Sequence, residues 1–357
     1  MKVFASAIGQ YDNVGDTVLR RAFLQAVRTA GDLHVYVGRQ TTDQTDALGL
    51  TPDDVLHRDS ASWRAELSRT MGRTPALYAF DTGETELERR FAQRYLRLAP
   101  LLAANRLRGG AAVHVGVGVR RSTVWRHPIA AVLQTCQLVA WRDELSRRVL
   151  GVGEVAPDWA FHLGADEAAL RSDHPRPVLA VALRAGLPHD PRPEPDEAWV
   201  ASVREMAERT GLEPVFAAQI GRDGDLAELL AKRVGGSALC WESARHTDAE
   251  AALRALYRRS AVIVSDRLHG LVIAATEGAS PLALSSHPTD KAARTLAAVG
   301  LRAAVVDHRL TDAGAAVAAV EAAAARRPEV VDRVIEARHA LDRLVARISA
   351  LGGGKAA

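Results

Sequence analysis

The sequence predicts an α/β protein with two parallel-sheet domains. Short β-prone apolar runs alternate with longer helical patterns along the 357 residues, and a polar, proline-containing stretch divides the alternation into two halves. Such alternation is typical of parallel sheets covered by helices. In chain order, the runs expected to form strands are residues 3–8, 33–37, 112–119, 178–183, 214–218, 261–264 and 281–284.

The domain boundary is expected within residues 164–177. A chain of this length suits two domains of about 150 residues each. The segment around His174 and Pro177 is polar, and a fresh apolar strand follows it. We therefore expect an N-terminal Rossmann-like domain over residues 1–168, a C-terminal Rossmann-like domain over 169–326, and a terminal helix and tail over 327–357.

The terminal segment has the pattern of a long amphipathic helix, preceded by a helical alanine-rich run at 315–325. Its apolar residues recur three and four positions apart. They are Val334, Ala337, Leu341, Leu344, Ile348 and Leu351, and glycines at 352–354 end the pattern. The stripe must be buried against the other domain or a second subunit, so a homo-oligomer is compatible with the sequence.

Charge and cysteine content narrow the class of protein. The 46 basic and 43 acidic residues are mixed along the chain, which argues against a nucleic-acid partner. Cys136 and Cys240 lie far apart in apolar surroundings, which favours a reduced cytoplasm over disulfides or a zinc site. No apolar run approaches the roughly 18 residues of a membrane span. We expect a cytoplasmic protein, with peripheral association at the inner membrane face compatible with its pI near 9.1.

The most informative motif is Ser265-Asp-Arg267-Leu-His269-Gly270, directly after the apolar run 261–264. Ligands of open parallel sheets bind at the carboxyl ends of the strands, where helix N-termini attract anions. Arg267 adds a planar charged fork suited to carboxylate or phosphate, and His269 can exchange a proton near neutral pH. The motif predicts an anion clamp beside a proton-transfer group. In the structural alternative, Arg267 pairs with Asp266 or another acid and His269 caps the helix.

The amino terminus repeats this strand–loop–helix arrangement, with a helix expected to open at Asp16. Glycines in the loop, Gly15 among them, allow close backbone approach. Asn13 and Asp16 suit hydrogen bonds to sugar hydroxyls, although Asn and Asp are also standard helix caps. An acid here would repel phosphate, so this end is expected to bind a sugar acceptor.

Two further cations are candidates for anion contacts. Arg184 follows the run 178–183 and Lys291 follows the run 281–284, each at a carboxyl edge. The alternatives without a ligand are that Arg184 forms a surface or inter-domain ion pair and that Lys291 is a solvated side chain. Arg142 stands beside two acids and is expected to be structural. No histidine has a metal-ligand partner at useful spacing, so no metal site is predicted.

With these residues identified, the chain resembles the polysaccharide pyruvyl transferase family from Gly9 through Leu301. Three segments carry the resemblance in order: Asn13-Val-Gly-Asp16; Trp141-Arg142-Asp143-Glu144-Leu-Ser146 with Pro157-Asp158; and Ser265-Asp-Arg267-Leu-His269-Gly with Lys291. The resemblance implies a GT-B-like architecture of two Rossmann-like domains facing a central cleft.

The resemblance also implies the chemistry. Phosphoenolpyruvate would be the donor substrate, with no separate cofactor, and a sugar or glycan, lipid-linked or free, the acceptor. Arg184, Arg267 and His269 would contact the donor, with Gly270 and Lys291 nearby and His269 as acid/base. One hydroxyl adds to C2 while C3 takes a proton, and a second displaces phosphate to give a cyclic ketal, in cell-envelope or exopolysaccharide assembly.

One departure and two alternatives remain at this stage. Where many relatives carry a glycine-rich turn, this chain has Ala76-Leu-Tyr-Ala-Phe-Asp81-Thr-Gly-Glu84, which leaves the acceptor open. A GT-B nucleotide-sugar glycosyltransferase is the main alternative, but the position seven residues before Pro281, where such enzymes carry a ribose-binding acid, is Ala274. Glu277, almost a turn later, is a poor substitute. The other alternative is a non-catalytic sugar- or anion-binding relative.

Overall fold

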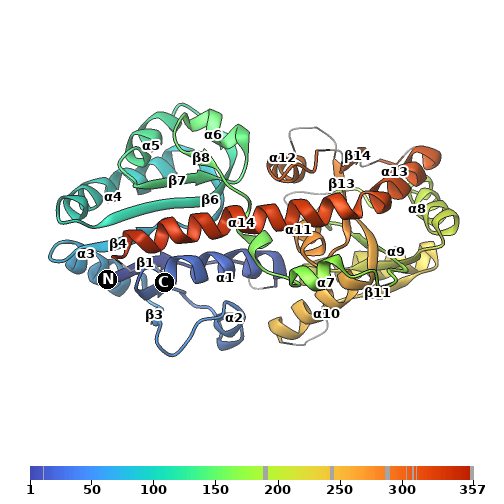
Figure 1. Cartoon of the computed structure of the whole chain (residues 1–357), viewed down its shortest axis with the longest axis horizontal. Coiled ribbons are helices and arrows are strands. Elements are labelled where there is room, and N and C mark those ends of the chain that lie inside the picture. Colours follow the sequence, from blue (N-terminus) through green and yellow to red (C-terminus); the bar gives the residue numbers. More distant parts are fainter. Residues whose placement is uncertain are drawn as a thin grey trace. The chain divides into compact units, whose positions relative to one another are not determined.

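The computed structural model describes residues 1–10, 12–187, 192–241, 245–285, 290–302, 304–307, 309–310 and 312–353. The chain divides into two compact units (Figure 1). The N-terminal unit comprises Met1–Tyr11, Asp16–His162 and Arg338–Ala357. The C-terminal unit comprises Asp12–Gly15 and Leu163–Ala337. The short segment Asp12–Gly15 therefore belongs with the second unit, although it stands near the start of the chain.

The N-terminal unit is a parallel sheet with the strand order β3-β2-β1-β4-β6-β7-β8, and β5 pairs with β6 beyond the end of β4. Its strands are β1 (Lys2–Ser6), β2 (Asp32–Tyr36), β3 (Val55–His57), β4 (Ala76–Ala79), β5 (Gly83–Leu87), β6 (Ala111–Ser122), β7 (Leu138–Trp141) and β8 (Glu154–Val155). Its helices are α1 (Val14–Arg28), α2 (Thr42–Ala47), α3 (Ser60–Met71), α4 (Arg89–Leu107), α5 (Arg126–Leu133) and α6 (Glu144–Leu150), followed by the 3₁₀ turn η1 (Trp159–His162).

The C-terminal unit is a second parallel sheet, in the order β11-β10-β9-β12-β13-β14. Its strands are β9 (Val178–Ala182), β10 (Glu213–Ala217), β11 (Ser237–Leu239), β12 (Ser260–Ser265), β13 (Ser280–Ser285) and β14 (Val305–Asp307). Its helices are α7 (Glu167–Arg171), α8 (Glu197–Thr210), α9 (Gly224–Val234) after the turn η2 (Gly221–Asp223), α10 (His246–Arg259), α11 (Leu268–Thr276), α12 (Lys291–Ala298) and α13 (Ala313–Ala325).

Each of the seven apolar runs coincides with a strand, and every strand end lies within a few residues of its expected position. The remaining strands of the described chain were not predicted, and each of them is only two to five residues long. At the amino terminus the expected boundary was wrong. Helix α1 begins at Val14, two residues before the expected Asp16, so Gly15 lies in its first turn rather than in the preceding loop.

The segment Ala76–Glu84, where the chain departs from its relatives, forms β4 and the start of β5. Both strands pair in parallel with the long strand β6, with Leu77 opposite Ala111 and Gly83 opposite Val117. The segment is therefore part of the sheet.

The long helix α14 (Arg327–Leu351) supplies the expected amphipathic stripe (Figure 1, red). Val334, Leu341 and Ile348 are each 0% exposed, so the stripe is buried within the chain itself and needs no second subunit. Residues up to Ala337 belong to the C-terminal unit, and those from Arg338 onward belong to the N-terminal unit. The alanine-rich run before it is helical, as α13.

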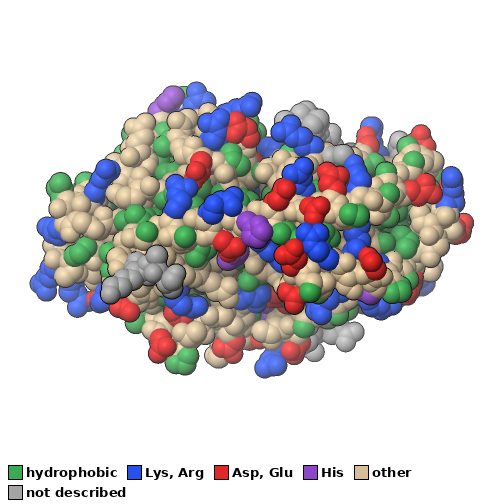
Figure 2. All heavy atoms as spheres, viewed as in Figure 1, with side chains coloured by type: hydrophobic (Ala, Val, Ile, Leu, Met, Phe, Trp, Pro, Cys, Tyr) green, Lys and Arg blue, Asp and Glu red, His purple; other side chains and the backbone are tan. Residues whose placement is uncertain are grey.

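None of the described helices is long and apolar enough to cross a membrane. Basic and acidic side chains are interspersed over the face shown in Figure 2, as the mixed sequence predicts. Both cysteines are free thiols.

Candidate functional site

The strand order of the C-terminal sheet reverses between β9 and β12, which pair in parallel at its centre. The chain proceeds outward from β9 through β10 to β11, and from β12 through β13 to β14. Ligands of open α/β sheets bind at such a switch point, beyond the carboxyl ends of the strands. Arg184 follows β9, and Arg267 follows β12. Two of the residues predicted to contact the donor substrate therefore lie at this point.

Arg267 forms a buried ion pair with Asp223, a residue that follows β10. The distance from Arg267 Nη2 to Asp223 Oδ1 is 2.5 Å, and the side chains are 10% and 1% exposed. Burial lowers the pKa of Arg267 and raises the pKa of Asp223, while the attraction between them opposes both shifts. Arg267 remains charged, because an arginine pKa lies so far above neutrality. The partner is thus an acid other than the neighbouring Asp266.

Asp266 and Asp223 also hold the loop after β9. Asp266 accepts the backbone N–H of Arg184 at 2.8 Å, and Asp223 accepts that of Ala185 at 3.0 Å. Asp266 further pairs with Arg192 at 2.7 Å. Because both acids bind this loop, the half-buried Arg184 is positioned by the same pair of carboxylates that flank Arg267.

The turn from β12 into α11 is held by Ser265. Its hydroxyl donates to the carbonyl of Ala182 at 2.5 Å and accepts the backbone N–H of Arg267 at 2.9 Å. Arg267 occupies the N-cap position, which leaves the half-buried His269 and the buried Gly270 in the first turn of α11.

Asn13 and Gly15 join this group within the C-terminal unit. Gln219 donates from Nε2 to Asn13 Oδ1 at 3.2 Å, and its carbonyl accepts the N–H of Val14 at 3.3 Å. A Cβ atom on Gly15 would lie 2.4 Å from His269 Cβ and 2.5 Å from Gln219 Nε2. Gly15 is therefore packed against the predicted acid/base, and Asn13 is linked to the same group through Gln219.

Asp16, the third predicted acceptor residue, is engaged in the N-terminal unit. Its carboxylate accepts the backbone N–H of Gln10 at 3.0 Å and pairs with Arg20 at 3.2 Å. Asp16 thus fastens the loop before α1 to the first turns of that helix, whereas Asn13 and Gly15 belong to the C-terminal unit.

Lys291 is the first residue of α12, and its side chain is exposed. The segment 286–289, which joins it to β13, lies outside the described residues. Across the described chain, no group of three or more His, Cys, Asp or Glu is arranged to hold a metal ion.

Two residues at the site, Asp223 and Gln219, were not identified from the sequence. Both follow the apolar run that forms β10. Their position after the carboxyl end of a predicted strand was the feature of the sequence that could have identified them. The buried pairing of Asp223 with Arg267 spans 44 residues and depends on the strand order.

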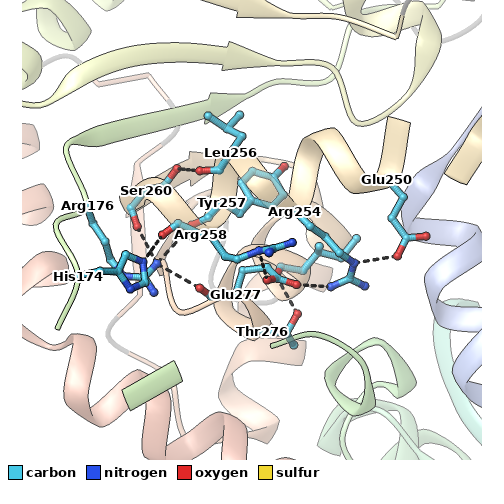
Figure 3. Close-up of polar contacts among 11 residues, drawn as sticks. His174, Arg176, Glu250, Arg254, Leu256, Tyr257, Arg258, Ser260, Thr276 and Glu277 are labelled. Atoms are coloured by element: carbon cyan, nitrogen blue, oxygen red, sulfur yellow. Dashed lines mark hydrogen bonds and ion pairs between the residues drawn. The ribbon is translucent and has the colours of Figure 1, made fainter. Parts of the chain in front are cut away.

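Glu277 is committed to a buried ion-pair network at the far end of α11 (Figure 3). It is 2% exposed and pairs with Arg254 at 2.6 Å and Arg258 at 3.0 Å. Arg254 also binds Glu250 at 2.8 Å, and Arg176 donates to the Glu277 carbonyl at 3.1 Å. With its carboxylate held by two arginines, Glu277 is not positioned to replace the ribose-binding acid missing at Ala274.

Arg142 is structural, as expected, but its partners are distant in sequence. It is 2% exposed and pairs with Glu84 at 2.9 Å and with Asp158 at 3.6 Å. Its neighbour Asp143 instead caps α6 by accepting the N–H of Ser146 at 2.8 Å. The ion pair between Arg142 and Asp158 thus joins the two parts of the second family segment, Trp141–Ser146 and Pro157-Asp158.

Comparison with solved structures identifies the class of fold. UDP-GlcNAc 2-epimerase from Neisseria meningitidis, bound to UDP-GlcNAc, matches with a TM-score of 0.54 at 10% identity, covering 94% of each chain. Apo OtsA matches with a TM-score of 0.51 at 10% identity over 97% of this chain and 98% of its own. An O-GlcNAc transferase from Thermobaculum terrenum reaches 0.50 at 12% identity over 99% and 67%. At this identity the likeness establishes the fold, which is GT-B-like.

A family model described as polysaccharide pyruvyl transferase matches residues 13–288, well over half of the chain. The protein belongs to the polysaccharide pyruvyl transferase family. A search of curated proteins gave no significant match.

Proposed function

We propose that this protein transfers the enolpyruvyl unit of phosphoenolpyruvate onto two hydroxyls of a sugar, forming a pyruvate ketal and releasing phosphate. Family membership supports a transferase with a saccharide acceptor. The observation that carries the proposal is the convergence of Arg184, Arg267 and His269 at the switch point of the C-terminal sheet.

Arg267 is suited to bind the donor anion. Asp223 engages Nη2, whereas Nε is buried and makes no hydrogen bond to any other described residue. A buried donor without a partner costs about 1–3 kcal/mol, which a carboxylate or phosphate oxygen of the ligand would recover. Arg184, and Lys291 as a point charge, would share the remaining negative charge. Asp223 reduces the net positive charge but orients the guanidinium.

His269 would move the protons that the reaction requires. The first sugar hydroxyl forms a bond to C2 of the donor while C3 gains a proton and becomes a methyl group. The second hydroxyl then forms the other C2–O bond as the C2–O bond to phosphate breaks. Each hydroxyl loses its proton, one being used at C3 and one leaving with phosphate. The two ring nitrogens of an imidazole can give and take these protons.

Asn13, which accepts a hydrogen bond from Gln219, would face the acceptor sugar. An amide can both donate to and accept from a hydroxyl, which suits recognition of a diol. The acceptor and a role in cell-envelope or exopolysaccharide assembly follow from the family only, and the same holds for a lipid-linked acceptor at the membrane face.

The principal alternative is a nucleotide-sugar glycosyltransferase, because the structural neighbours share the fold and one of them binds UDP-GlcNAc. Two observations oppose it. Ala274 occupies the place of the ribose-binding acid, and Glu277 is held by arginines.

Ligand-dependent thermal unfolding tests the proposal without knowledge of the acceptor. We expect phosphoenolpyruvate to stabilise the wild type, by about 2.7 kcal/mol at a hundred times its dissociation constant, and UDP and GDP to have no effect. Arg184→Gln and Arg267→Lys should reduce the stabilisation. The lysine retains a charge for Asp223 but lacks the planar fork. Stabilisation by a nucleotide instead would favour the glycosyltransferase.

A further inference from the structure

A pocket lies on the side of the C-terminal sheet opposite to the candidate site. It opens beside Ser280, the first residue of β13, and its volume is about 170 Å³. Because β13 runs parallel to β12, with Ser280 opposite Val262 and Ala283 opposite Ser265, the pocket is at the amino ends of these strands. The Arg267 group stands beyond their carboxyl ends.

Three elements form the pocket. The start of β13 contributes Ser280, the turn after α12 contributes Leu301, and the junction of α13 with α14 contributes Ala323 and Val330. These last three side chains are buried and apolar. The volume exceeds the roughly 150 Å³ of an engineered apolar cavity that binds benzene, so a body of that size fits.

Polar groups are placed around this apolar interior. Ser280 is 1% exposed, and its hydroxyl makes no hydrogen bond to another described residue. The exposed Arg302 and the half-buried Arg326 line the pocket, together with the exposed Glu329. Two arginines and one glutamate leave one net positive charge.

We propose that this pocket binds a compact monoanion, an apolar body carrying one carboxylate. The apolar walls of Leu301, Ala323 and Val330 surround the body, and Arg302 and Arg326 bind the carboxylate. The single net positive charge of the lining favours a monoanion over a phosphate dianion, because a dianion would leave the site with one net negative charge. This site is separate from the proposed donor site and does not depend on the proposed function.

Benzoate is the probe that matches this description. We expect saturation-transfer NMR and isothermal titration of the full-length protein to show benzoate binding, with benzamide, its neutral counterpart, at least about tenfold weaker. Arg302→Gln should weaken benzoate by about tenfold. Ala323→Leu should abolish binding by filling the interior. Phosphoenolpyruvate should not displace benzoate.

Arg209→Gln is the matched control, because Arg209 is an exposed arginine of the same unit outside the pocket. It should leave benzoate affinity unchanged. Ala323→Leu alters a buried position, so Arg302→Gln, at an exposed one, provides an independent result. The proposal is overturned if the wild type does not bind benzoate at millimolar concentration. It is equally overturned if folded Ala323→Leu and Arg302→Gln both bind it as the wild type does, or if phosphoenolpyruvate displaces it.

Discussion

Gly15 lies directly against His269, close enough that a Cβ atom at residue 15 would come within 2.4 Å of the histidine Cβ and 2.8 Å of its Nδ1. Only a residue without a side chain fits this contact. The glycine of the amino-terminal motif therefore sets the position of the histidine in the motif that follows β12. Two motifs separated by more than two hundred residues meet at a single pair.

Gly15→Ala should displace His269 without removing it. We expect turnover of phosphoenolpyruvate with a suitable acceptor to fall by about a hundredfold, since a misplacement near 1 Å has that effect on catalysis. Steady-state phosphate release measures it. Gly314→Ala is the matched control, because Gly314 is also helical and its nearest neighbour, Asp312 Oδ1, is 3.4 Å from an added Cβ. Equal activity in both variants would show that the contact has no catalytic consequence.

His269→Gln tests the acid/base role directly. Glutamine retains hydrogen bonding but cannot shuttle a proton at neutral pH, so turnover should drop by at least about a hundredfold. Stabilisation by phosphoenolpyruvate in thermal unfolding should persist. His339→Gln, an exposed histidine on α14, serves as control. A His269→Gln enzyme with wild-type turnover is incompatible with the proposed mechanism.

Asp223→Asn should destabilise the C-terminal unit far more than Asp266→Asn. The first variant leaves the buried Arg267 guanidinium without its countercharge, at a cost of about 3 kcal/mol. The second loses a pair with Arg192, which is 41% exposed, at a cost below about 1 kcal/mol. Urea unfolding of the two variants measures the difference. Similar losses would mean that the buried pair does not stabilise this unit as inferred.

His114 should make the protein sensitive to mild acid. It is fully buried, and its Nε2 lies 2.9 Å from the Tyr95 hydroxyl. Burial lowers its pKa from 6.5 to about 3. Between these two values the unfolded chain binds a proton that the folded protein does not, so stability falls as pH decreases through this window.

Between pH 7 and pH 5, this one group should lower the free energy of unfolding by about 2 kcal/mol. His114→Gln keeps a hydrogen-bonding group but does not titrate, and should lose that much less over the same interval. Urea unfolding at the two pH values gives the comparison. A wild type and variant with identical pH dependence would exclude His114 as the source.

The local elements were largely predictable because they depend on local patterns. The seven apolar runs became strands, and the amphipathic stripe of α14 is buried, since alternating apolar runs and a three-and-four spacing allow few other structures. The start of α1 was misplaced by two residues because Asn13 and Asp16 both suit a helix start. Short strands such as β8 and β11 form only by pairing with a neighbour already in place.

The sequence alone determined the α/β class, the family motifs and the placement of Arg267 and His269 at a strand-to-helix junction. These follow from residue types and spacing along a continuous segment. Only the tertiary structure decided that Arg267 pairs with Asp223, that Gly15 abuts His269 and that Asp16 instead binds within the N-terminal unit. The physical reason is that a strand order such as β10-β9-β12 brings together the ends of strands that are distant in sequence. The side chains that follow those strand ends can then pair with one another.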